Sequence, residues 1–200
     1  MLAAIGAPAD LMEWAYRCGL EEIEHTRICF ALAAGYGGRS HSVKPMPDLL
    51  LCGLDMEGDP VVTLATESLK DGCQLEEFNA DVAFACEAVC KEPATRFVLE
   101  QIAREERGHA AFSWAVLEYL YERNPEKVRP AIETSLREID SYRRPTAFSW
   151  EKKRLVEKAD PELMLKHGRL PDEEWAKMWD ARLIQTKTRL QAMLNEKRAA

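Results

Sequence analysis

Apolar residues recur at every third or fourth position along most of the chain, and alternating patterns typical of strands are scarce. The breaks in this pattern fall at glycine and proline residues. The pattern therefore predicts an all-α protein. We expect long helices over residues 10–35, 61–91 and 94–121, a shorter helix after Pro125 that Pro130 interrupts, and a last helix over about 171–197.

The connections between the predicted helices differ in length. About 25 residues, from Gly35 to Pro60, separate the first two long helices, which is longer than an ordinary loop and long enough to cross a bundle. Only a few residues around Pro93 separate the second from the third, so these two should be antiparallel neighbours. Asp10, with Glu13 three residues later, is expected to cap the start of the first helix.

Two of the long helices contain the motif Glu-x-x-His, as Glu22 to His25 and as Glu106 to His109. Residues three apart lie on the same face of a helix, so each motif offers a carboxylate and an imidazole to one point. Both motifs fall on predicted buried stripes, where an unpaired carboxylate is costly. In the first helix that stripe is Leu11, Ala15, Cys18, Glu22, His25, Cys29 and Leu32. A metal ion would offset this cost; the alternative is a metal-free set in which Glu and His pair with one another.

The second long helix offers Glu76 at the same height. With a turn at about residue 92, Glu76 lies sixteen residues before it, and Glu106 and His109 lie fourteen and seventeen after it. Glu76 shares its stripe with small and apolar residues, whereas the stripe of Glu77 is interpreted as a solvent face. The sequence therefore predicts one buried metal-binding layer, made of Glu22, His25, Glu76, Glu106 and His109.

This layer, with a long crossover before the second helix, resembles the ferritin-like di-iron carboxylate fold, in which successive helices supply Glu, Glu-x-x-His, Glu and Glu-x-x-His. Residues 19–26, 71–76 and 102–110 are similar to segments of bacterial ferritin-like domain proteins. The resemblance implies a ferritin-like helical bundle over residues 1–122 and a C-terminal helical extension over 123–200 that packs on it. The chain matches the last three of the four ligand helices, and the helix carrying the first Glu would precede Met1.

The resemblance also implies roles for the five residues. Glu22 and Glu106 would bridge two metal ions, His25 and His109 would each hold one, and Glu76 would be a terminal ligand. Sites rich in carboxylates, with one imidazole per metal, favour Fe or Mn over Zn. The absent first carboxylate would belong to the metal beside His25, which must then take water or another carboxylate.

Glu13 and Asp180 are the candidates for that replacement carboxylate. His41 and His167 are expected at the surface instead. Cys29 and Cys73 lie one turn from His25 and Glu76, so a thiol near the metal is an alternative to ordinary core packing.

The resemblance implies a non-haem oxidoreductase that binds two Fe ions, or Mn, and uses O2 or peroxide, with a small-molecule substrate as an open question. One alternative is an iron-binding protein of ferroxidase or storage type without an organic substrate. Another is a helical scaffold whose site has decayed. The chain has no four-cysteine iron domain, which argues against a rubrerythrin-like peroxidase carrying its own electron donor.

Composition narrows the class further. A hydrophobic content of 46% suffices for a core, and no apolar run is long enough to span a membrane. The first residues do not form a secretory signal, so we expect a cytoplasmic protein, and the net charge of −7 disfavours a nucleic-acid partner. The six cysteines form no CxxC pair and are expected to be free thiols.

Three long helices leave one apolar flank uncovered. We expect either the last helix or a second copy of the chain to cover it, and self-association is the favoured solution. The residues of the last helix that would pack there are Trp175, Trp179, Leu183 and Leu190.

Overall fold

The computed structural model describes residues 1–42, 45, 58–144 and 158–196. Regular structure within these ranges is helical, without a strand, which confirms the all-α prediction. Cys52, one of the six cysteines that are expected to be free thiols, lies outside the described residues.

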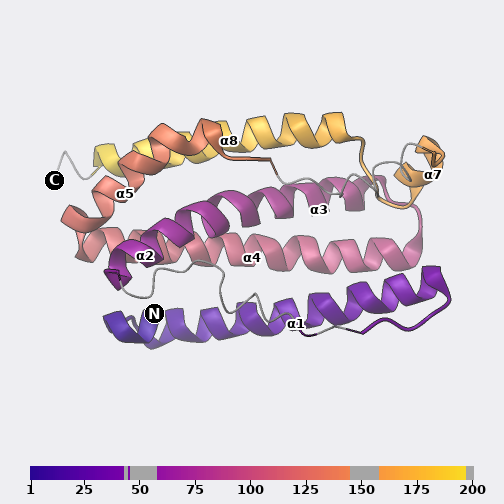
Figure 1. Cartoon of the computed structure of the whole chain (residues 1–200), viewed down its shortest axis with the longest axis horizontal. Helices are drawn as coiled ribbons and strands as arrows, with labels where there is room; N and C mark the ends of the chain where they lie inside the picture. The colour runs from indigo at the N-terminus through magenta and orange to yellow at the C-terminus, as the bar shows by residue number, and fades with distance from the viewer. Residues whose placement is uncertain (43–44, 46–57, 145–157, 197–200) are drawn as a thin grey trace.

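The predicted long helices are present with boundaries shifted by a few residues. The helices are α1 (Ala9–Gly37), α2 (Pro60–Glu67), α3 (Glu77–Val89), α4 (Pro93–Arg123), α5 (Pro125–Glu138), α7 (Pro161–Lys166) and α8 (Asp172–Glu196). Short 3-10 helices, η1 (Leu2–Ile5) and η4 (Ile139–Ser141), and a π-helical segment, η3 (Ser68–Glu76), complete the order. Figure 1 shows three tiers, with α1 alone, then α2, α3 and α4, and then α5 and α8.

Helix α1 is the least covered of the long helices. Among the described elements it packs against α4 and η1 only. Of the seven residues of its predicted buried stripe, Leu11 and His25 are buried, while Glu22 and Cys29 are exposed. That prediction was wrong in extent, because a helix with one long neighbour buries a narrow strip rather than a broad face.

The N-terminal ends of α1 and α4 are built differently. Pro8, not Asp10, is the N-cap of α1, and the Asp10 carboxylate accepts a hydrogen bond from its neighbour's backbone N–H instead. Glu92 caps α4 by accepting from the backbone N–H groups of Ala94 and Thr95, and these bonds lower its pKa to about 2. The short turn before Pro93 directs α4 back along α3, as predicted.

The second predicted long helix is continuous from Pro60 to Val89, but its middle is the π-helical segment η3. Such wide turns are rare and concentrate at functional sites. Within η3, Gly72 lies so close to α4 that a Cβ there would sit 1.9 Å from Ser113 Oγ. The close contact sets the position of Glu76, which ends this segment one turn later.

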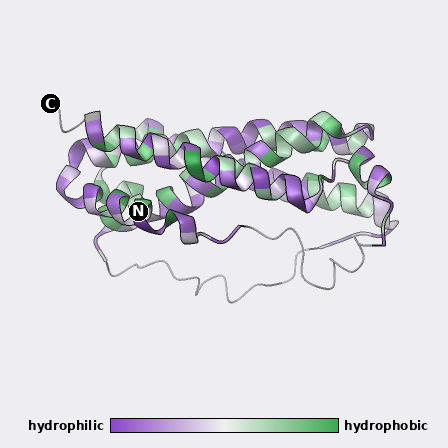
Figure 2. Ribbon diagram, turned by 90° about the horizontal axis from the view of Figure 1, so that it is seen from above, coloured by the Kyte–Doolittle hydropathy of each residue, from purple (hydrophilic) through white to green (hydrophobic). Residues whose placement is uncertain are grey.

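Helix α8 covers α3 rather than α1. The ring of Phe78 meets those of Trp175 and Trp179 at centroid distances of 5.9 and 5.0 Å, and Leu183 and Leu190 are buried. Among the described elements α8 makes no contact with α1. The flank of α1 is therefore not covered by the C-terminal helix. Figure 2 shows the helices from above, with hydrophilic and hydrophobic residues interspersed along them.

A buried charge network ties α8 to the inner helices. Arg182 donates to Asp81 at 2.8 Å and also pairs with Glu77, while Arg107 of α4 donates to the other oxygen of Asp81 at 2.6 Å. The side chain of Arg182 is 9% exposed and that of Glu77 14%. The prediction that Glu77 faces solvent was wrong, because α8 lies over that stripe.

None of the helices in the described ranges combines the length and the apolar character that crossing a membrane requires.

Candidate metal centre

Helices α1 and α4 bring the two Glu-x-x-His motifs together at the middle of their lengths. Glu22 Oε1 lies 3.5 Å from His25 Nδ1 and 3.2 Å from His109 Nδ1. Glu106 likewise faces both rings, with Oε1 3.6 Å from His25 Nδ1 and Oε2 3.8 Å from His109 Nδ1. The two imidazole rings are 5.8 Å apart between centroids. One carboxylate from each helix therefore lies between the two histidines.

The five predicted residues form two groups with a shared member. Glu22, His25 and Glu106 can each offer a ligand atom within 4.8 Å of the others, and so can Glu76, Glu106 and His109. Glu106 belongs to both groups. The structure thus brings together all five residues that the sequence singled out, from α1, η3 and α4.

The centre is less buried than the sequence implied. His25, Glu106 and His109 are buried, whereas Glu76 is half-buried and the Glu22 side chain is 54% exposed. The exposure of Glu22 follows from the position of α1, which is covered by α4 from one side only. One edge of the centre is therefore open to solvent.

Among the described residues, Glu106 is the carboxyl group whose ionised form its surroundings disfavour most strongly. Its burial, followed by the neighbouring carboxyl of Glu76 and the charges of Glu22 and Glu105, raises its pKa to about 9. Its Oε2 is buried and accepts no hydrogen bond of normal geometry. A divalent cation between these carboxylates would remove the repulsion and supply the missing partner, so the residues present fit a metal.

Two further carboxylates, which were not predicted from the sequence, hydrogen-bond to the Nε2 atoms of the two histidines. His25 Nε2 donates to Glu105 of α4 at 2.8 Å, and His109 Nε2 donates to Glu21 of α1 at 2.9 Å. Each contact joins a histidine of one helix to a carboxylate of the other. Both leave Nδ1 facing Glu22 and Glu106, as in metal sites where a second carboxylate orients the ligand imidazole. The sequence signal was available, because both motifs read Glu-Glu-x-x-His.

The replacement carboxylates expected from the sequence do not reach the centre. The Glu13 side chain is 76% exposed and pairs with Arg17. Asp180 is exposed on α8, which does not contact α1. Neither residue belongs to a group capable of holding a metal in the described part of the chain.

The other two histidines and the two predicted thiols are not part of the metal-binding groups of the centre. His41 is exposed and stacks on Phe30, whereas His167 is half-buried and hydrogen-bonds to Tyr36, so neither is near the centre. Cys73 is buried and Cys29 exposed.

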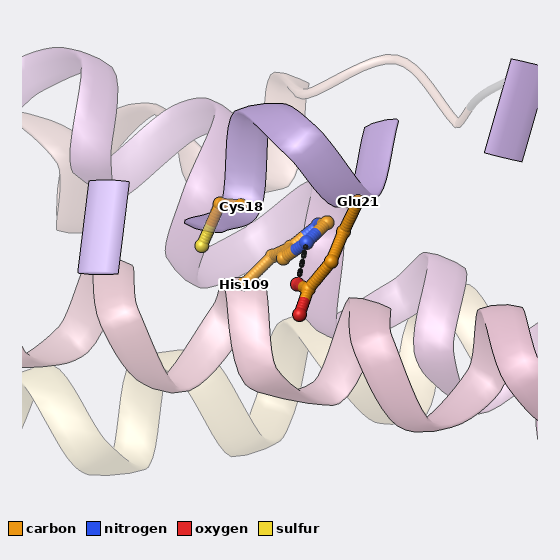
Figure 3. A group of neighbouring side chains, drawn as sticks. All are labelled: Cys18, Glu21 and His109. Carbon is orange, nitrogen blue, oxygen red and sulfur yellow. Dashed lines mark hydrogen bonds and ion pairs between the residues drawn. The ribbon is translucent and has the colours of Figure 1, made fainter. Parts of the chain in front are cut away.

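The thiol near the centre belongs instead to Cys18, which lies beside Glu21 and His109 (Figure 3). Burial and the negative charge of Glu21 raise the pKa of this thiol to about 11. Without a cation nearby, it therefore keeps its proton.

An apolar groove of about 580 Å³ runs between α1 and the first turns of α4. Ile28 and Leu32 line it from α1, and Phe97 and Val98 from α4. Ile28 lies one helical turn beyond His25, so the groove begins on the His25 side of the centre rather than beside Glu76 and His109.

Comparison of the chain with protein-family models, with characterised proteins and with solved structures finds no match. The function is therefore inferred from the geometry of the centre.

Proposed function

We propose that this protein is a non-haem oxidoreductase of the ferritin-like kind, with a dinuclear centre of Fe, or of Mn, that reacts with O2 or peroxide. The observation that supports this most is the sharing of Glu106 between two Glu/His groups, each with its own imidazole. A pair of hard carboxylate-rich positions joined by one carboxylate suits two such ions better than one tetrahedral Zn²⁺.

The residues divide into those that would hold the metals and those that orient them. Glu22 and Glu106 would bridge, because each faces both histidines. His25 and His109 would each bind one ion through Nδ1, and Glu76 would complete the His109 position. Glu21 and Glu105 lie against Nε2 of the two rings, and by accepting the Nε2 proton's hydrogen bond they would leave the lone pair of Nδ1 free for a metal.

Two adjacent ferrous ions supply two electrons to O2 or peroxide when they are bound. The protein's own contribution is to fix both positions and to admit small reactants. Buried His25, Glu106 and His109 keep the inner side dry, and the exposed Glu22 leaves one edge open for O2 or peroxide.

The groove favours a reaction with an organic molecule over simple iron oxidation. Its walls are mainly apolar, and it starts one turn from His25. A small apolar substrate or reductant that lies in it would approach the metal position that has the fewer protein ligands. The observation that favours the ferroxidase alternative is the exposed carboxylate of Glu22 beside the half-buried carboxylate of Glu21, because the two together would attract Fe²⁺.

The outer face of α1 supports self-association. Tyr16, Leu20 and Ile23 are 78%, 67% and 51% exposed and lie at spacings of four and three residues, as on helices that pair. We propose that a second copy of the chain covers this face. Light scattering should give a dimer or larger assembly for the wild type and a smaller species for Leu20→Glu, and a monomeric wild type would contradict it.

The number of Fe ions bound per chain tests the proposed function. Wild-type protein should take up two Fe ions per chain, and Glu106→Ala should lose most of both. Glu100→Ala, an exposed glutamate of the same helix, is the matched control and should load like wild type. Unchanged metal content in Glu106→Ala would contradict the site.

Repeated additions of Fe(II) in air distinguish the two functions. A ratio that stops at two Fe per chain supports the oxidoreductase. Continued accumulation beyond two would instead identify an iron-storage protein and contradict the oxidoreductase.

A further inference from the structure

Both ring nitrogen atoms of His109 face carboxylate groups. Nδ1 faces Glu22 at 3.2 Å and Glu106 at 3.8 Å, whereas Nε2 faces Glu21 at 2.9 Å. The ring is buried, at 5% exposure, so neither nitrogen is simply solvated. A cation can therefore be offered a ligand on either side of this ring.

A thiol lies close to both Glu21 and His109. Cys18 and Glu21 are three residues apart on α1, so both side chains project from one face of the helix, toward α4. Their Sγ and carboxylate oxygen, with a nitrogen of His109, all lie within 4.8 Å of one another (Figure 3). In a tetrahedral zinc site, bond lengths of about 2.0 to 2.3 Å place ligand atoms roughly 3.3 to 3.8 Å apart. Small side-chain rotations would bring the three atoms to that spacing.

We propose that Cys18, Glu21 and His109 Nε2 form a second metal site, specific for Zn²⁺ or a similar borderline cation and distinct from the carboxylate groups. The donor set is one sulfur, one nitrogen and one oxygen, with water in the fourth position. A thiolate ligand selects Zn²⁺ over Mn²⁺, and binding displaces the thiol proton and the Nε2 proton. The two negative charges of Cys18 and Glu21 then balance the cation.

This site and the carboxylate centre exclude each other at His109. A neutral imidazole has one lone pair, so a metal on Nε2 leaves the proton on Nδ1, which can no longer bind a second metal. Zn²⁺ at Cys18 therefore removes one ligand from the position that also uses Glu76. The inferred consequence is that Zn²⁺ lowers the loading of the carboxylate centre by direct competition for one ring.

Co²⁺ is a spectroscopic probe for this site, because a cobalt–thiolate bond gives a charge-transfer band in the near ultraviolet. We expect wild-type protein to show the band, Cys18→Ser to lose it, and Glu21→Gln to bind Co²⁺ more weakly. Cys29→Ser is the matched control, since Cys29 is an exposed thiol of the same helix, and it should keep the band. Glu76→Gln should also keep it, because Glu76 belongs only to the carboxylate centre.

Several outcomes would overturn the proposal. Absence of the band in folded wild type would do so, and so would its survival in Cys18→Ser or its loss in Cys29→Ser. If Cys18→Ser does not fold, as judged by circular dichroism, Cys18→Ala and Glu21→Gln serve the same comparison.

The competition between the two sites is measured by loading Mn²⁺ after one equivalent of Zn²⁺. Wild type should bind less Mn²⁺ than without Zn²⁺, and Cys18→Ser should show no such loss. Because the band is read without Fe or Mn, its result is independent of the proposed oxidoreductase function.

Discussion

The carboxylate of Glu105 lies 2.8 Å from His25 Nε2, across the interface between α4 and α1. The contact has a counterpart in the opposite direction, from Glu21 of α1 to His109 of α4 at 2.9 Å. The carboxylate that orients each histidine of the candidate metal centre thus comes from the helix that carries the other histidine. Moving either helix would misalign both imidazoles together.

Glu105→Gln is expected to weaken metal binding at the His25 position by about 10- to 100-fold, the usual effect of losing an orienting carboxylate. The His109 position should change little, because Glu21 holds that ring. Mn²⁺ binding followed by electron paramagnetic resonance would resolve the two affinities. Glu100→Gln, an exposed glutamate of the same helix, is the control. Equal weakening of both positions would show that Glu105 acts on the helix pair rather than on His25.

Metal-free Glu106→Gln should be more stable than metal-free wild type at pH 8, and the difference should shrink toward pH 5. The pKa of Glu106 is raised from 4.5 to about 9, so the unfolded chain releases this proton at a lower pH than the folded chain does. Wild-type stability therefore falls as the pH rises through that window, whereas glutamine has no proton to lose. Urea unfolding with a chelator present checks this, and a variant less stable than wild type at pH 8 would refute it.

Gly72→Ala should destabilise the fold by about 1 to 3 kcal/mol, because the added methyl group overlaps Ser113. Ser113→Gly should restore part of the loss in the double variant, since it removes the overlapping atoms. Gly19→Ala is the matched control, because nothing lies within 4 Å of a Cβ there. Thermal unfolding gives the comparison. A Gly72→Ala variant as stable as wild type would mean that η3 and α4 separate at little cost.

Arg182→Met should cost roughly 3 to 5 kcal/mol, because it leaves the nearly buried Glu77 without its closest partner and Asp81 with Arg107 alone. Lys177→Met on the same helix removes an exposed ion pair with Glu174 and should destabilise the protein much less, because solvent screens that pair. Chemical denaturation of both variants measures the difference. Similar losses would show that the Arg182 network contributes no more than a surface pair.

Much of the fold was predictable because the helices are long and their ends are marked by proline and glycine. The periodicity of α4 located both Glu106 and His109, and counting residues from the turn located Glu76. The π-helical segment was not predictable, because it depends on how closely Gly72 approaches Ser113 in another helix. Periodicity that assumes 3.6 residues per turn cannot contain that information.

The limits of the site prediction have a similar origin. Glu21 and Glu105 each precede a predicted ligand by one residue, which places them about 100° around the helix from it. They therefore lie outside the apolar stripes from which the ligands were predicted. They reach the histidines because α1 packs against α4, so that each carboxylate lies next to the histidine of the other helix. The exposure of Glu22 could not be predicted either, since it depends on α1 having one long neighbour. Both features belong to the packing of helices rather than to any single helix.

The most direct test of the central claim is anomalous diffraction from anaerobic crystals of the full chain, at sub-stoichiometric and at saturating Fe(II). We expect two peaks at saturation, one on each side of Glu106. At low iron the peak beside His109 and Glu76 should be the stronger, because that position has the additional carboxylate. No peak beside Glu106, or one peak remote from both histidines, would contradict the dinuclear centre, and preferential filling beside His25 would contradict the assigned ligands.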